Sequence, residues 1–290
     1  MSEPSPQATA APTLPGALRL GPVHLTVRAL QRAIDWYERS LGLRMHARAD
    51  RIAELGDGGE TVVVLEEDPD AIPAGRHAGL YHYALLYPSR LALARAALRL
   101  IATQTPIQGA SDHGTHEAIY LPDADGNGIE LAADRPREQW PQGLGYGGRP
   151  APLDFEDLVS LVRGEEPQPF VDEGLRVGHL HLHVGDIDEA LAFYRDLVGL
   201  EEQANLGTAS FLSAGGYHHH LGVNVWNGRG VGPAPEHAVG LRHWTIVLPA
   251  GEDVADVRAR LEVRGVAIAD RDGGFLARDP WGTAVAFEPS

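Results

Sequence analysis

Residues 21–43 read GPVHLTVRALQRAIDWYERSLGL, and residues 178–200 read GHLHLHVGDIDEALAFYRDLVGL. The second stretch repeats the first at an offset of 157 residues, with matching glycines, histidines and tyrosines and a common Gly-Leu end. Each stretch opens with apolar residues at every second position, which indicates a strand, and continues with apolar residues at helical spacing. The repeat therefore predicts the same strand–helix unit in both halves of the chain.

A related unit occurs twice more, as LYHYALLYPSRLALARAALRLI at residues 80–101 and LRHWTIVLPAGEDVADVRARLE at residues 241–262. The two copies align through His82 and His243, and each again predicts a strand followed by a helix. Short β-rich segments with glycines follow all four helices. The sequence therefore predicts four βαβββ modules, at residues 17–68, 78–134, 174–228 and 238–289.

The modules divide the sequence into two domains, 17–134 and 174–290, and predict an α+β fold class. A Pro/Gly-rich linker joins them at residues 135–173, with a short helix expected at residues 153–162. Residues 1–16 are rich in Pro, Ala and Ser and are expected to form a loose tail rather than a signal peptide.

Composition excludes several classes of function. The chain has 24 basic and 40 acidic residues, a net charge of −16, which repels nucleic acid and anionic membranes. No apolar run approaches the roughly 18–20 residues that span a bilayer. The absence of cysteine excludes disulfides and thiolate metal sites. Because no export signal is recognised either, we expect a cytoplasmic protein. The 14 histidines offer imidazole ligands instead.

Four βαβββ modules resemble the vicinal oxygen chelate superfamily, which includes glyoxalases, bleomycin-resistance proteins and extradiol dioxygenases. The resemblance covers nearly the whole chain and is closest to the two-domain catechol 2,3-dioxygenases. It implies that the modules pair, so that two curved sheets each enclose a cavity. The fold alone does not indicate the reaction, because the superfamily contains several kinds of enzyme and metal-free binding proteins.

The most specific motif starts at His113 and reads HGTHEAIYLPDADGNGIE as far as Glu130. It resembles the extradiol dioxygenase signature, in which a histidine, an apolar-Tyr pair and a turn precede a glutamate. The resemblance implies that Glu130 is a metal ligand and that His113 and Tyr120 contact the catecholate oxygens. The motif departs from the signature at Ser111 and Ala124, and neither departure removes a chemically active group.

The resemblance also implies two histidine ligands on the first strands of modules. His82 occupies that position in the second module. In extradiol enzymes the other ligand lies fifteen residues before the tyrosine that ends the first helix. His179 lies fifteen residues before Tyr194, whereas His24 lies thirteen residues before Tyr37. Spacing therefore favours His179, with His24 as the alternative.

The choice of ligands depends on which modules pair. Pairing sequence neighbours places Pro22 in one ligand position and Ala286 in another, so both ligand sets are incomplete. Pairing the second module with the third completes one set: His82, Glu130 and His179. The linker is long enough to permit this cross-pairing but does not require it.

A weaker second candidate metal site would use His243 and Glu288 of the fourth module. Glu288 lies two residues beyond the position that matches Glu130, and the module has no counterpart of His113 or Tyr120.

The third module also contains the run Tyr-His-His-His-Leu at residues 217–221. The run resembles the strand that carries the acid–base histidine of extradiol enzymes, and the match assigns that role to His219. If the second and third modules pair, His219 faces the same metal as His113 and Tyr120. Tyr81 and Trp226 are candidate pocket aromatics, as are Tyr83 and Trp244, although core packing is the commoner role of such residues.

The resemblance implies an enzyme that cleaves catechol or a substituted catechol with O2 beside the diol. Its metal would be Fe(II), with Mn(II) as the alternative, because a set of two histidines and one carboxylate serves both. The partners implied are a small molecule and O2, with homo-oligomer formation left open. Two alternatives remain: a glyoxalase- or epimerase-like metalloenzyme, which would need a fourth protein ligand, and a metal-free binding protein of the resistance type.

Overall fold

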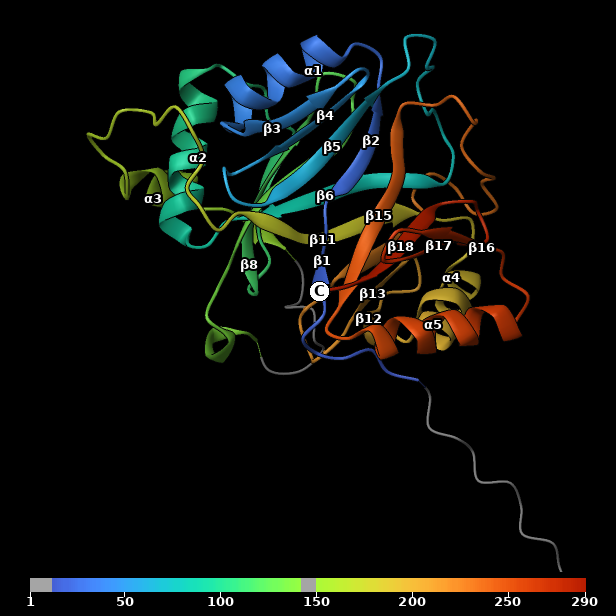
Figure 1. Cartoon of the computed structure of the whole chain (residues 1–290). Coiled ribbons are helices and arrows are strands. Elements are labelled where there is room, and N and C mark those ends of the chain that lie inside the picture. Colours follow the sequence, from blue (N-terminus) through green and yellow to red (C-terminus); the bar gives the residue numbers. More distant parts are fainter. Residues whose placement is uncertain (1–11, 142–149) are drawn as a thin grey trace, which may run out of the picture.

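The computed structural model describes residues 12–141 and 150–290. Within these ranges every predicted module appears in its predicted order of one strand, one helix and three strands. The molecule is mixed α+β, with two large curved sheets, which confirms the predicted fold class (Figure 1). Across the described ranges, no helix combines the length and the apolar character needed to cross a membrane.

The elements of the four modules follow in chain order. The first module contains β2 (Val23–Val27), α1 (Leu30–Trp36), the π-helical turn η1 (Tyr37–Leu41), β3 (Arg44–Ala49), β4 (Ile52–Gly56) and β5 (Thr61–Glu67). The second contains β6 (Gly79–Leu86), α2 (Arg90–Ala102), β7 (Gly109–Asp112), β8 (His116–Pro122) and β9 (Gly128–Asp134). The third contains β11 (Arg176–His183), α4 (Ile187–Phe193), the π-helical turn η3 (Tyr194–Val198), β12 (Glu201–Asn205), β13 (Ala209–Ser213) and β14 (Leu221–Asn224). The fourth contains β15 (Gly240–Leu248), α5 (Gly251–Val263), β16 (Ile268–Arg271), β17 (Gly274–Arg278) and β18 (Ala284–Pro289).

Short elements lie outside the modules: β1 (Arg19–Leu20), the 3-10 turn η2 (Arg137–Gln139), β10 (Ala151–Pro152) and α3 (Phe155–Ser160). The linker is thus partly structured, because β10 extends a sheet by pairing with β7 and α3 forms within the helix expected at residues 153–162. Residues 1–11 of the expected tail lie outside the described residues. Its last residues are not loose, because Leu14 is buried and its N–H donates to the carbonyl of Gly199 at 2.8 Å.

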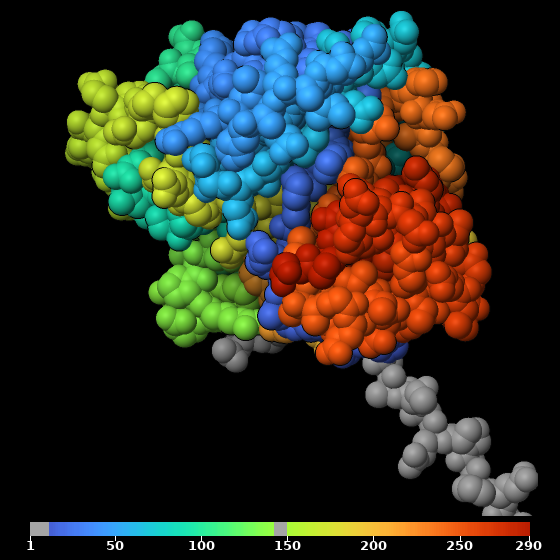
Figure 2. Space-filling view, in the orientation of Figure 1, coloured from blue at the N-terminus to red at the C-terminus, as the bar shows by residue number. Residues whose placement is uncertain are grey.

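The sheets combine modules from opposite halves of the chain. One sheet has the order β16-β17-β18-β15-β2-β5-β4-β3, with β1 on β15, and so joins the fourth module to the first. The other has the order β10-β7-β8-β9-β6-β11-β14-β13-β12 and joins the second module to the third. Figure 1 shows β6 and β11 side by side, and in Figure 2 the blue first module adjoins the orange-red fourth module. The sequence division into 17–134 and 174–290 therefore cuts across both sheets.

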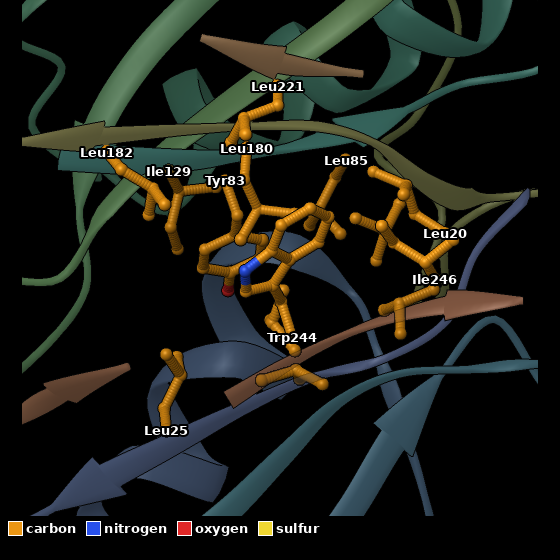
Figure 3. Packing of buried hydrophobic residues seen from close by; sticks show 14 of the residues in the cluster. Leu20, Leu25, Tyr83, Leu85, Ile129, Leu180, Leu182, Leu221, Trp244 and Ile246 are labelled. Carbon is orange, nitrogen blue, oxygen red and sulfur yellow. The ribbon is translucent and has the colours of Figure 1, made fainter. Parts of the chain in front are cut away.

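The two sheets share one hydrophobic core. Trp244 of β15 is fully buried and lies among Tyr83 and Leu85 of β6 and Leu180 of β11 (Figure 3). These side chains alternate along their strands with residues on the opposite face, as the strand period requires. Tyr83 and Trp244 are therefore core residues. Burying such large rings stabilises the contact between the sheets by roughly 1.5–3 kcal/mol per side chain.

The repeated tyrosines join the helices to the turns of neighbouring modules. Tyr37 donates its hydroxyl proton to Asp123 at 3.0 Å, and Tyr194 donates to Asp279, also at 3.0 Å. Each tyrosine is fully buried. Sequence neighbours are thus linked through helices and turns, whereas distant modules are linked through their sheets.

Asp279 provides a test of this packing. Burial raises its pKa from 3.8 to about 6, although hydrogen bonds from Tyr194 and backbone amides oppose the shift. Its stabilising contribution is therefore present below about pH 4 and is lost as the pH rises through about 6. Relative to Asp279→Asn, the wild-type free energy of unfolding should fall by about 2–3 kcal/mol between pH 4 and 7. Urea unfolding of both proteins measures this difference; a difference that does not change with pH would contradict the raised pKa.

Candidate metal centre

The candidate ligands lie on three adjacent strands of the second sheet. Ala84 of β6 pairs with Glu130 of the parallel strand β9 on one side and with His179 of the antiparallel strand β11 on the other. His82 lies two residues before Ala84 and therefore shares its face. Because the side chain of Ala84 is small, the side chains of Glu130 and His179 on either side of it can approach each other. The strand pairing of the second and third modules thus brings the three predicted ligands together.

Two glycines allow the strands to approach in this register. A Cβ at Gly128, two residues before Glu130, would lie 2.1 Å from the carbonyl oxygen of Tyr81. A Cβ at Gly178 would lie 2.8 Å from the side chain of Leu86, where the pairing of β11 with β6 shifts register. Such irregularities re-aim side chains, and here the shift directly precedes His179.

The three ligand atoms nearly meet. Nε2 of His82 and Nε2 of His179 each lie 3.1 Å from Oε2 of Glu130. All three residues are buried, with Glu130 only 1% exposed. The nearest candidate ligand atoms of the group lie within 4.8 Å of one another, as expected for a three-residue metal site.

The electrostatics suit a divalent cation. Burial alone would raise the pKa of Glu130, but the adjacent imidazoles of His179, His116 and His82 hold it well below its ordinary value. Burial lowers the pKa of His179, which favours the neutral imidazole. A carboxylate with neutral imidazoles is the protonation state that binds a metal. Oε1 of Glu130 is also buried and accepts no hydrogen bond among the described residues.

His116 was not predicted and lies next to this group. Its Nε2 is 3.2 Å from Oε1 of Glu130, close enough for an ion pair although the angle does not give a hydrogen bond. Its Nδ1 contacts the hydroxyl of Thr115 at 2.9 Å. Contacts of this kind hold a ligating carboxylate in orientation. The signal was present in the sequence, because His116 and Tyr120 share one face of β8 by strand alternation.

The predicted catalytic residues surround the same group. Nε2 of His113 lies 2.7 Å from the hydroxyl of Tyr120, and the ring of Tyr120 lies 5.5 Å from that of His82. The ring of His219 lies 4.0 Å from that of His179. Burial and the adjacent histidines lower the pKa of His219 well below its ordinary value, so this imidazole is neutral at pH 7.

Aromatic and imidazole rings form a wall of the candidate site beside His82. The ring centroid of Tyr81 lies 5.4 Å from that of His181 and 5.4 Å from that of Trp226, and both contacts are edge to face. Tyr81 and Trp226 are 40% and 51% exposed, so they form the outer part of this wall. His181 is buried, and among the described residues its Nε2 has no hydrogen-bond partner.

The structure does not bring His24 to Glu130. His24 lies in the other sheet, where its ring stacks on that of His243 with centroids 3.8 Å apart. Arg271 donates from Nη1 to Nε2 of His243 at 2.8 Å, and its Nη2 lies 3.8 Å from Glu288. The guanidinium of Arg271 occupies the lone pair of Nε2 of His243, which a metal would need, and its positive charge repels a cation. His24, His243 and Glu288 form no group of mutually close ligand atoms in the described part of the chain.

Known proteins share both the sequence pattern and the fold. The family model of the glyoxalase/bleomycin resistance protein/dioxygenase superfamily matches residues 19–131 and 176–287. A protein named catechol-2,3-dioxygenase from Bacillus subtilis (strain 168) is 40% identical over 268 residues, covering 90% of this chain and 93% of that protein.

Two solved structures show the likeness of fold. A putative dioxygenase from Bacillus subtilis subsp. subtilis str. 168 matches with a TM-score of 0.64 at 17% identity, over 93% of this chain and 85% of that one. A point mutant of glyoxalase I from Zea mays matches with a TM-score of 0.59 at 17% identity, over 94% of both chains. The chain belongs to the glyoxalase/bleomycin resistance protein/dioxygenase superfamily.

Proposed function

We propose that the protein is an extradiol dioxygenase that cleaves catechol or a substituted catechol with O2. The observation that carries the proposal is the convergence of His82, Glu130 and His179 beside the pair His113–Tyr120 and the ring of His219. The relative named catechol-2,3-dioxygenase, 40% identical over 90% of the chain, supports the same reaction class.

His82, His179 and Glu130 would hold one divalent metal, with Fe(II) preferred over Mn(II) for this reaction. Three protein ligands leave positions open for a bidentate substrate. When bound, the metal supplies Lewis acidity toward the catechol oxygens and one-electron chemistry with O2, which the side chains lack.

The side chains supply binding and proton transfer. His219, neutral at pH 7, accepts a proton from a catechol hydroxyl and returns it after the ring has opened. Tyr120 donates a hydrogen bond to a substrate oxygen, and His113 fixes the direction of that hydroxyl through their 2.7 Å contact. The exposed rings of Tyr81 and Trp226 offer an apolar wall to the aromatic ring of the substrate.

The overall reaction balances without a further reductant. The carbon–carbon bond next to the diol breaks, both atoms of O2 enter the product, and catechol becomes a muconic semialdehyde. A glyoxalase-like reaction is the second candidate, but the ligand group contains only three residues in the described chain and lacks the fourth ligand that this alternative needs.

The test is single-turnover chemistry on the full chain loaded anaerobically with Fe(II). On addition of catechol and ¹⁸O2, we expect equal consumption of catechol and O2 and two ¹⁸O atoms in a ring-opened product. Tight metal binding without O2 consumption for any catechol, together with isomerase activity on a hemithioacetal, would instead favour the glyoxalase-like alternative. Failure to bind a metal would favour a binding protein.

A further inference from the structure

Asp134, the last residue of β9, is linked to His219 through His218. Oδ1 of Asp134 lies 3.1 Å from Nε2 of His218. Nδ1 of His218 in turn lies 2.8 Å from Nδ1 of His219. Both histidines are buried, at 1% and 2% exposure, and the side chain of Asp134 is 24% exposed. The three residues thus form a chain from near the surface to the candidate metal centre.

Hydrogen-bond chemistry fixes the direction of this chain. An ionised carboxylate only accepts, so Nε2 of His218 must carry the proton that it donates to Asp134. A neutral imidazole has one N–H, which leaves Nδ1 of His218 as an acceptor. The 2.8 Å contact then requires His219 to donate from Nδ1. Nε2 of His219 is consequently the unprotonated nitrogen of that ring.

Neighbouring groups hold the chain in place. Tyr217 donates its hydroxyl proton to Oδ2 of Asp134 at 2.9 Å, which occupies the second carboxylate oxygen. The ring of His116 stacks on that of His218 with centroids 4.6 Å apart and an interplanar angle of 15°. The stacked ring of His116 restricts rotation of the His218 ring, which sets the protonated nitrogen of His219.

We propose that Asp134 and His218 are positioning residues that fix the tautomer of His219, so that Nε2 presents a lone pair to the substrate. The inference rests on the proposed function for the role of His219. A general base needs an unprotonated nitrogen directed at the proton it removes. In the opposite tautomer Nε2 would present an N–H, and proton removal would have to wait for a rearrangement.

The same residues could instead bind a second metal ion. His116, Asp134 and His218 offer ligand atoms within 4.8 Å of one another, a spacing suited to a second metal ion. The hydrogen bonds already accepted by both oxygens of Asp134 favour the positioning role. Two equivalents of metal per wild-type chain, falling to one in His218→Phe, would establish the metal site and overturn the proposal.

Three variants separate the roles of these groups. His218→Phe keeps a ring at this buried position and removes both nitrogens, while Asp134→Asn removes the charge. Tyr217→Phe is the matched control, because it removes the other hydrogen bond to Asp134 and leaves the histidine chain intact. We expect kcat to fall about 100-fold or more in His218→Phe, with KM and metal content near wild type, and at most a few-fold in Tyr217→Phe. The double variant of Asp134 and His218 should lose little more than His218→Phe alone, because both act through one chain.

A spectroscopic measurement tests the inference independently of catalysis. Two-bond ¹⁵N–¹H correlation spectra of the full metal-free chain, labelled with ¹⁵N-histidine, identify the protonated nitrogen of each ring. We expect Nδ1–H for His219 in the wild-type and Tyr217→Phe proteins and loss of that preference in His218→Phe. Nε2–H for His219 in the wild-type protein would overturn the proposal whether or not catechol is cleaved. The expected tautomer in a protein that cleaves no catechol would refute the proposed function and leave the inference intact.

Discussion

His179→Ala is expected to weaken metal binding by more than about 100-fold and to abolish ring cleavage. The variant removes one of the three proposed metal ligands and one of the two imidazole nitrogens that lie 3.1 Å from Glu130. Loss of groups that merely support a ligand already costs about 10–100-fold in metal affinity or activity, so loss of a ligand should cost more. Competition with a metal-binding dye measures the affinity of each purified protein.

His24→Ala is the matched control. His24 occupies the equivalent strand of the other sheet, where it stacks on His243. Its removal should leave the metal affinity within about two-fold of wild type, since surroundings distant from a site contribute little to it. The opposite outcome, in which His24→Ala loses the metal and His179→Ala keeps it, would refute the assignment of the ligands.

His219→Phe is expected to lower kcat by about 100- to 10,000-fold while metal content stays at the wild-type level. Phenylalanine keeps the ring that packs 4.0 Å from His179 and 5.2 Å from Phe211 but cannot accept a proton. Anaerobic loading with Fe(II), metal analysis and initial rates over a range of catechol concentrations separate the two quantities.

The adjacent His220 provides the control. Its Nδ1 accepts a hydrogen bond from the N–H of Ala214 at 3.2 Å. His220→Gln should change kcat by no more than a few-fold, because glutamine also offers an acceptor. Equal losses of kcat in both variants would mean that the run of histidines acts through folding, and an unchanged kcat in His219→Phe would exclude it as the acid–base group.

The repeat predicted the fold because period-two and helical spacing are local properties of the chain. Alternation also predicted that His82 and His179 lie on first strands. The order of strands across a sheet is not local: the pairing of β6 with β11 joins residues about 100 positions apart and is set by packing of Trp244, Tyr83 and their neighbours. The sequence therefore left the pairing of modules open.

The residues that contact the predicted site residues do not follow from the sequence motifs. His116 and Asp134 are cross-strand partners on β8 and β9, so their proximity follows from a register that the motif does not specify. His218 belongs to the predicted histidine run, but its partner Asp134 comes from another module. The sequence also does not predict that the guanidinium of Arg271 lies against His243, where a metal ion would otherwise bind. The two residues are far apart in the sequence and meet only in the folded chain.

An anomalous difference map from crystals of the full chain grown with Fe(II) or Mn(II) tests the proposed ligands directly. We expect one strong peak per chain, coordinated by Nε2 of His82, Nε2 of His179 and the carboxylate of Glu130. A peak between His24, His243 and Glu288, or no peak beside Glu130, would contradict this expectation.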